Sequence, residues 1–208
     1  MSWLENKILR LSKKYNLSHI GSCLTVSGPM EAIYKIKKSD EPFILSNGHA
    51  GLALYCVLEK EVVANAEELW NKHGVHPNRD IDNGIWASAG SLGHGLGIAV
   101  GYALSDRQRL VYCMISDGEA AEGSIWEALR IAGDLRLENL RLVVVCNGYS
   151  AYGKVDVDVL EERLKTFYPC LVIKTNLFNY PEWLQGLQAH YVTIDEEKWK
   201  SLEIKDDE

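Results

Sequence analysis

Residues 115–124 have the sequence "ISDGEAAEGS", and this stretch decides the fold. The apolar run 110–114 before it predicts a buried strand, and the spacing of apolar residues over 122–135 predicts a helix. A second apolar run, 141–146, predicts another strand, so the three elements form a βαβ unit. Near-continuous apolar strands are typical of parallel sheets covered on both faces. The sequence therefore predicts an α/β fold with a mostly parallel β-sheet and helices on both faces.

Length and composition narrow the class of protein further. The chain has 208 residues, 47% of them hydrophobic, so we expect a single domain over residues 1–208. With a formal net charge of -7 and no basic run, we expect no nucleic-acid partner. No segment approaches the roughly 20 apolar residues of a membrane span, and the first residues are charged where a signal peptide is apolar. We expect no membrane association and a cytoplasmic location, and five irregularly spaced cysteines favour reduced thiols.

The N-terminal part predicts two helices separated by a loop. Amphipathic spacing indicates a helix over residues 3–15, and the polar stretch 16–28 follows as a loop. Ser27 stands where an N-cap is expected, and Pro29 comes just inside the second helix.

The remaining segments predict a further strand, a long loop and a tail. Residues 43–45 form a short apolar strand, followed by a Ser-Asn-Gly turn and a helix that begins near His49. The glycine- and histidine-rich stretch 71–97 predicts a loop, and loops of this length inside a compact domain are usually functional. Residues 171–174 predict a strand, and the charged tail 195–208 is expected to be solvated or frayed.

Polar side chains follow both strands of the βαβ unit. Asp117 and Gly118 follow the first strand, and Asn147 follows the second. Because the carboxyl ends of parallel strands meet at the edge where open α/β sheets bind ligands, Asp117 and Asn147 are expected to be neighbours. Their oxygens suit Mg²⁺ or Ca²⁺ better than zinc, and Gly118 allows close approach of an anion. The alternative is an ordinary Asp-Gly turn, with Glu119 and Glu122 stabilising a helix start.

These residues resemble a known cofactor motif. An Asp-Gly-Glu after a strand, with an Asn 30 residues beyond the Asp, is similar to the thiamine-diphosphate motif. Three further stretches resemble the transketolase family: "SHIGSCLT" at 18–25, "FILSNGHAGLALY" at 43–55 and "GSLGHGLGIAVGYAL" at 90–104. The resemblance extends over about residues 5–165. It implies the thiamine-diphosphate-binding fold and a role as the N-terminal, diphosphate-binding (PP-type) subunit of a split transketolase.

The resemblance implies the residues that would bind the cofactor and its metal. Gly118 and His49 would contact the diphosphate, and Gly90 and Leu92 would contact the aminopyrimidine ring through their backbones. Asn147 would contribute to both cofactor and metal binding. The implied metal ligands all offer an oxygen atom: Asp117, Asn147 and the backbone carbonyl of Tyr149. The metal would be Mg²⁺, with Ca²⁺ or Mn²⁺ as substitutes.

The resemblance also implies four catalytic residues: His19, His76, Glu122 and His190. His19 and His76 would face the reacting sugar, because imidazole exchanges protons near neutral pH and donates to sugar or phosphate oxygens. His190 would match a late histidine near the cofactor and substrate. Glu122 would link two active sites across a dimer interface. His73 and His94 are expected to be structural or solvated.

Transketolases need a second domain, and this chain is too short to contain it. We expect an α₂β₂ assembly with a C-terminal transketolase-like subunit that carries the pyrimidine-binding domain. The assembly would transfer a two-carbon ketol unit from a ketose to an aldose, with thiamine diphosphate as the cofactor. Its substrates would be sugars or sugar phosphates. Gly97 and Gly101 lie four residues apart on a predicted helix and favour close packing, for example against a partner subunit.

Several positions depart from the family pattern. Ser116 replaces the first glycine of the cofactor motif, Ile20 replaces a proline and Asn47 replaces a lysine. The last part of the chain diverges most, which leaves the substrate range open. Two alternatives also remain: a subunit of another thiamine-diphosphate enzyme, of the α-keto acid dehydrogenase E1 type, and a non-catalytic scaffold that retains the fold.

Overall fold

A parallel four-stranded sheet lies at the centre of the protein. The computed structural model describes residues 1–62, 64–202 and 204. The strand order is β1-β2-β3-β6, and all three pairings are parallel, which confirms the predicted α/β fold. These strands comprise Phe43–Leu45 (β1), Val111–Ser116 (β2), Leu140–Cys146 (β3) and Leu171–Lys174 (β6). A small antiparallel hairpin of β4 (Tyr149–Ser150) and β5 (Gly153–Lys154) follows β3.

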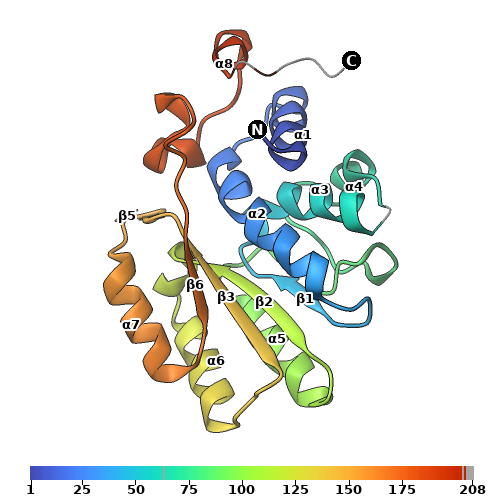
Figure 1. The fold of residues 1–208 in the computed structure, drawn as a ribbon, viewed down its shortest axis with the longest axis vertical. Helices are drawn as coiled ribbons and strands as arrows, with labels where there is room; N and C mark the ends of the chain where they lie inside the picture. Colours follow the sequence, from blue (N-terminus) through green and yellow to red (C-terminus); the bar gives the residue numbers. More distant parts are fainter. Residues whose placement is uncertain (63, 203, 205–208) are drawn as a thin grey trace.

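Helices cover both faces of this sheet (Figure 1). Alternate residues of the strands point to opposite sides, so that Phe43 and Leu45 join one apolar core while Ile44 joins the other. The first core is formed with α1 (Trp3–Lys14), α2 (Ile20–Ile36), α3 (Gly51–Glu61) and α4 (Ala66–His73). The second core is formed with α5 (His94–Ser105), α6 (Gly123–Asp134) and α7 (Val157–Phe167). Strands β1, β2 and β3 are therefore largely buried on both faces, whereas the edge strand β6 is partly exposed.

The second helix begins earlier than the sequence predicts. The expected loop 16–28 is wrong from residue 20 onward, because α2 starts at Ile20 and contains both Ser27 and Pro29. Residues 20–27 are all buried, so packing against the sheet outweighs their modest helix propensity. The Ser27 hydroxyl donates to the carbonyl of Leu24 at 2.9 Å inside the helix, and therefore does not act as an N-cap.

The charged tail is also more ordered than expected. Glu196–Ser201 forms a helix, α8, which lies beside α1 in Figure 1. Leu202 is buried, and Trp199 packs against the first core. The expectation of a frayed tail is therefore wrong for residues 195–202, because these two apolar side chains hold the segment to the core. Residues 203 and 205–208 lie outside the described part of the chain.

The described helices contain no segment that is long and apolar enough to cross a membrane.

Candidate active site

A cavity of about 900 Å³ opens at the carboxyl edge of the sheet. The ends of β2 and β3, the start of α2 and the loop between α4 and α5 all contribute to its wall. The structure brings together nearly all of the residues predicted for the site. Those that line the cavity are His19, His49, His76, Gly90, Leu92, Asp117, Gly118, Asn147, Tyr149 and His190.

The predicted oxygen ligands meet where β2 and β3 end. Asp117 is buried, and its carboxylate accepts from the backbone N–H of Gly118 at 3.0 Å and of Gly148 at 2.7 Å. The side-chain oxygen of Asn147 accepts from the N–H of Tyr149 at 3.0 Å. A Cβ added to Gly118 would lie 3.8 Å from the Tyr149 carbonyl oxygen, so this carbonyl also lies beside the turn. The predicted juxtaposition of the Asp117 and Asn147 segments is therefore present.

The donor set at this edge fits a hard divalent cation. Burial raises the pKa of Asp117 to about 6, against the opposing effect of the backbone N–H groups that it accepts from. A bound cation would restore the ionised form, because a nearby positive charge favours the carboxylate. Within the described part of the chain, no three His, Cys, Asp or Glu side chains gather as metal ligands. A metal here would therefore rely on amide and carbonyl oxygens and on oxygens of a phosphate ligand, as Mg²⁺ commonly does.

Three histidine rings cluster in the wall of the cavity. The ring centroids of His19 and His190 are 4.3 Å apart, and each lies 5.3 Å from the centroid of His49. Burial, together with neighbouring imidazoles, lowers the pKa of His49 to about 3 and that of His19 to about 4. Burial also lowers the pKa of His190. At neutral pH the rings are therefore uncharged, and each can accept one hydrogen bond and donate another.

His19 has two features that mark a functional position. It is the N-cap of α2 with φ 61° and ψ 20°, a left-handed conformation that is uncommon outside glycine. Its ring Nδ1 is buried and has no hydrogen-bond partner, although buried polar atoms are normally paired. The fold thus leaves a buried imidazole nitrogen unpaired in the wall of the cavity.

The position of His190 depends on the last part of the chain. The N–H of His19 donates to the carbonyl of His190 at 2.9 Å, and Ser22 Oγ lies 3.3 Å from His190 Nδ1. A Cβ on Gly21 would come within 2.7 Å of the Ala189 side chain, so only glycine allows the segment to lie this close to α2. These contacts bring His190 into the histidine cluster.

Two glycines allow the loop between α4 and α5 to pack beside His49. A Cβ on Gly48 would lie 2.4 Å from the Ala89 carbonyl oxygen, and one on Gly51 would lie 2.5 Å from the Val75 carbonyl oxygen. Real Cβ atoms do not make such short contacts. The absence of side chains at both positions therefore sets how closely this loop approaches the His49 turn.

One buried carboxylate has a larger role than the sequence indicated. Glu119 is fully buried and accepts from Ser46 Oγ at 2.7 Å, Gly93 N–H at 2.8 Å and Ser116 N–H at 3.2 Å. It thereby joins the segment after β1, the glycine-rich segment and the end of β2. The two alanines that follow it, Ala120 and Ala121, are the sequence feature that could have indicated its burial, because a solvated helix start is usually more polar.

Glu122 is the predicted site residue that does not line the cavity. It is partly exposed at the N-cap of α6 and makes no side-chain capping bond. His94 is exposed at the start of α5. His73 is buried and contacts Asp80 at 3.1 Å, as a structural histidine does.

The fold and the site together define a class of α/β protein. Helices cover both faces of its parallel sheet, and one cavity at the carboxyl edge is lined by oxygen-bearing side chains and neutral imidazoles. The family description "Transketolase, thiamine diphosphate binding domain" matches residues 27–174. The chain therefore belongs to the transketolase family.

Relatives and solved structures agree with this assignment. The chain is 31% identical over 176 residues to 6-deoxy-6-sulfo-D-fructose transketolase subunit SqwG of Clostridium sp., covering 75% of this chain and 62% of that protein. It is 29% identical over 171 residues to one of the apulose-4-phosphate transketolase subunits of Phocaeicola vulgatus, covering 72% and 60%. The fold is similar to a transketolase from Campylobacter jejuni, with a TM-score of 0.70 and 24% identity over 96% of this chain and 40% of that chain. The chain thus spans less than two thirds of the length of each of these proteins.

Proposed function

We propose that this chain is the N-terminal subunit of a split transketolase-like enzyme. It would bind thiamine diphosphate and Mg²⁺ and, with a pyrimidine-domain subunit, transfer a two-carbon ketol unit from a ketose to an aldose. One observation carries the proposal: Asp117 and Asn147 line the same cavity as the histidine cluster. Two relatives that are themselves named as transketolase subunits support the split arrangement.

The residues at the strand ends fit the phosphate end of the cofactor. Asp117, Asn147 and the carbonyl of Tyr149 would hold the cation, and Gly118 and His49 would contact the diphosphate. Thiamine diphosphate supplies the nucleophilic carbon of ketol transfer when it is bound. The chain itself would position this group and exclude water from it. Ca²⁺ or Mn²⁺ would serve at the same oxygen ligands.

The histidines fit the sugar end of the cavity. His19, His76 and His190 would accept hydrogen bonds from sugar hydroxyls and donate hydrogen bonds to them. Because the pKa of His19 is about 4, its ring is neutral at pH 7 and can take up a proton from a reacting hydroxyl only transiently. The substrates would be sugars or sugar phosphates.

The exposed rim of the cavity supports the need for a partner. His76 and Gly90 are exposed, and at the mouth of the cavity Tyr152 is 86% and Phe178 is 78% exposed. Large exposed apolar groups beside a site commonly mark an interaction surface. The pyrimidine-domain subunit would cover this rim in an α₂β₂ assembly, and Glu122 would lie toward that interface.

The experiment is to isolate the tagged chain gently from its native cell in Mg²⁺ and to measure thiamine diphosphate per chain. Mass spectrometry of co-purifying proteins identifies the partner, and the Asp117→Ala variant is the matched control. We expect one cofactor per chain and a pyrimidine-domain protein, with the cofactor lost and the partner kept in Asp117→Ala. The complex should use a ketose donor and not pyruvate. A cofactor-free complex would contradict the proposal and favour a scaffold, whereas turnover of pyruvate would favour an α-keto acid dehydrogenase type.

A further inference from the structure

Residues 75–90, between α4 and α5, form a hairpin-like loop, which we call the cavity hairpin. Near its tip, Asp80 and Ile85 exchange two backbone hydrogen bonds of 2.8 and 2.9 Å. Nearer its base, the N–H of Ala89 donates to the carbonyl of Pro77 at 2.9 Å. Backbone hydrogen bonds therefore join the two arms near the tip and near the base. We expect a displacement of the tip to move the base as well.

The base of the cavity hairpin lies at the proposed cofactor and sugar site. His76 and Gly90 both line the cavity, and a Cβ on Gly90 would lie 3.7 Å from the Cβ of His76. Leu92 follows closely and lines the same cavity. The proposed contacts to the aminopyrimidine ring and one proposed contact to the sugar thus come from this element and the residues next to it.

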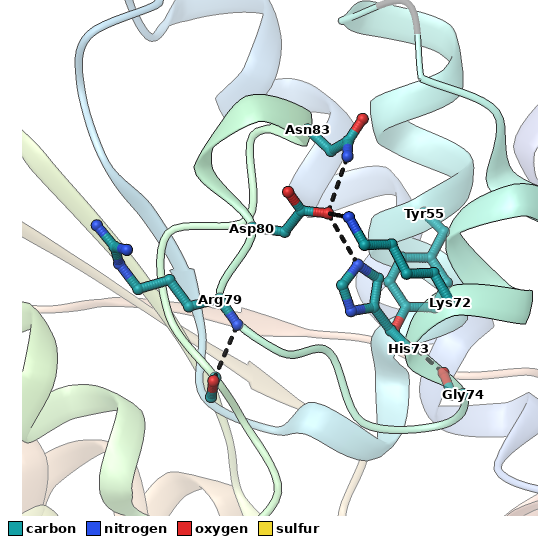
Figure 2. A network of polar contacts seen from close by, with 8 residues as sticks. Tyr55, Lys72, His73, Gly74, Arg79, Asp80 and Asn83 are labelled. Atoms are coloured by element: carbon teal, nitrogen blue, oxygen red, sulfur yellow. Dashed lines mark hydrogen bonds and ion pairs between the residues drawn. The ribbon is translucent and has the colours of Figure 1, made fainter.

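A single carboxylate fastens the tip to α4 (Figure 2). Asp80 Oδ2 accepts from Lys72 Nζ at 2.7 Å, from Asn83 Nδ2 at 2.8 Å and from His73 Nε2 at 3.1 Å. Burial opposes ionisation of Asp80, but the three donors outweigh it and lower the pKa to about 2. The Lys72 side chain is 59% exposed, so solvent screens its ion pair with Asp80, whereas the side chains of Asp80 and His73 are only 9% and 4% exposed.

His73 is itself held by the helix that follows the His49 turn. Its ring stacks on that of Tyr55 in α3, with centroids 6.1 Å apart and an interplanar angle of 29°. The Tyr55 hydroxyl donates to the carbonyl of Gly74 at 3.1 Å. Helix α3 begins at Gly51, two residues after His49. These contacts therefore connect the hairpin tip, through His73, to the helix that follows His49.

We propose that Asp80 is a positioning residue of the cofactor site, which fixes His76 and Gly90 beside the cofactor by fastening the far end of the cavity hairpin to α4. The inference rests on the proposed function. It assigns to Asp80 no contact with cofactor or substrate. The diphosphate end of the site, at Asp117 and Asn147, is built from other elements, so Asp80 should act on only one end of the cofactor.

The test compares two ligands on the full-length chain in complex with its co-purified partner subunit. Calorimetric titration of thiamine diphosphate with Mg²⁺, and separately of inorganic diphosphate with Mg²⁺, is carried out on wild type, Asp80→Asn and the control Asp82→Asn. Asp82 is an exposed carboxylate in the same tip. We expect Asp80→Asn to weaken the binding of thiamine diphosphate about 10-fold, which corresponds to the loss of one charge-assisted hydrogen bond. The affinity for inorganic diphosphate should not change. The control should change neither.

Hydrogen exchange provides a second readout that does not depend on the cofactor. In Asp80→Asn, amides of the cavity hairpin should exchange faster while those of α2 do not. Unchanged hydrogen exchange together with unchanged affinity for thiamine diphosphate would overturn the inference. An equal loss of affinity for both ligands would also overturn it, because it indicates general destabilisation. If wild type binds inorganic diphosphate but not thiamine diphosphate, the proposed function fails, while exchange still tests the anchor. Asn83→Ala, which removes one donor and keeps Asp80, should give a smaller effect in the same direction.

Discussion

Replacing Glu119 by glutamine tests whether this buried carboxylate holds the site together. Oε1 accepts from Ser46 Oγ and Gly93 N–H, and Oε2 accepts from Ser116 N–H. Glutamine has nearly the same shape but only one acceptor oxygen. If that oxygen keeps the first two donors, the new NH₂ group faces the Ser116 N–H and the two donors repel each other. In the reverse orientation the NH₂ group can donate to Ser46 Oγ, but it faces the Gly93 N–H, so either orientation leaves at least one buried donor without an acceptor.

The size of the effect follows from hydrogen bonding and desolvation. Losing a hydrogen bond to a charged group and leaving a buried donor unpaired costs about 1–3 kcal/mol each. Removing a buried charge offsets part of this, because burial raises the pKa of Glu119 and therefore opposes its ionised form. We expect Glu119→Gln to lower the free energy of unfolding by about 2 kcal/mol, which is roughly 4–8 °C in Tm for a chain of this size.

Urea unfolding at pH 7.5 measures this difference, with the m-value checked for constancy. The control is Glu127→Gln, an exposed carboxylate on α6, which should change stability by less than about 0.5 kcal/mol. Glu119→Ala should be worse than Glu119→Gln, at about 4 kcal/mol, because it adds a cavity and removes every acceptor. A Glu119→Gln protein as stable as the control would refute the argument that this carboxylate joins the three segments.

Three further predictions concern the glycines and histidines. Gly48→Ala would place its Cβ 2.4 Å from the Ala89 carbonyl oxygen, so it should cost about 1–3 kcal/mol in urea unfolding and weaken cofactor binding in calorimetry. Because the pKa values of His49 and His19 fall in the folded state, the unfolded state binds more protons below pH 6.5. Stability should therefore be complete above pH 6.5 and fall toward pH 4, by at most about 1.4 kcal/mol per pH unit for each histidine and less for half-buried His19. Stability in urea that does not change over this range would contradict the burial of neutral rings. Gly97→Ala, where an added Cβ meets nothing, should stabilise the isolated chain by about 1 kcal/mol yet weaken assembly in sedimentation, and unchanged assembly would exclude this helix from the interface.

The strands and the strand-end residues could be predicted because their signals are local. An apolar run of strand length followed by Asp-Gly indicates where a parallel strand stops, and the βαβ connection then fixes which ends share an edge. These signals place Asp117 and Asn147 at one edge without reference to any long-range contact. The pattern needs only chain order and handedness, both of which the sequence determines.

The start of α2 and the burial of Glu119 could not be predicted, because both depend on tertiary contacts. His19 has no capping side-chain bond and a left-handed backbone, so nothing near it in sequence indicates a helix start. Its position is set by the bond to His190, which is remote in sequence. Glu119 has the composition of a helix-start acid, and only its donors from three separate segments distinguish it from one.

Three largely buried carboxylates lie in or near the walls of the cavity and share one physical role. Asp117 and Glu119 accept hydrogen bonds from elements that are distant along the chain, and Asp80 accepts from α4, the helix that precedes it. A buried, hydrogen-bonded charge is costly to leave unpaired, so each junction has one strongly preferred geometry. We therefore expect the walls formed by the chain itself to keep their geometry, while Tyr152 and Phe178 on the rim are exposed. Binding of a partner would then complete the site by closing the rim without rebuilding its walls, and cofactor affinity should rise on assembly with little change in the hydrogen exchange of these three junctions.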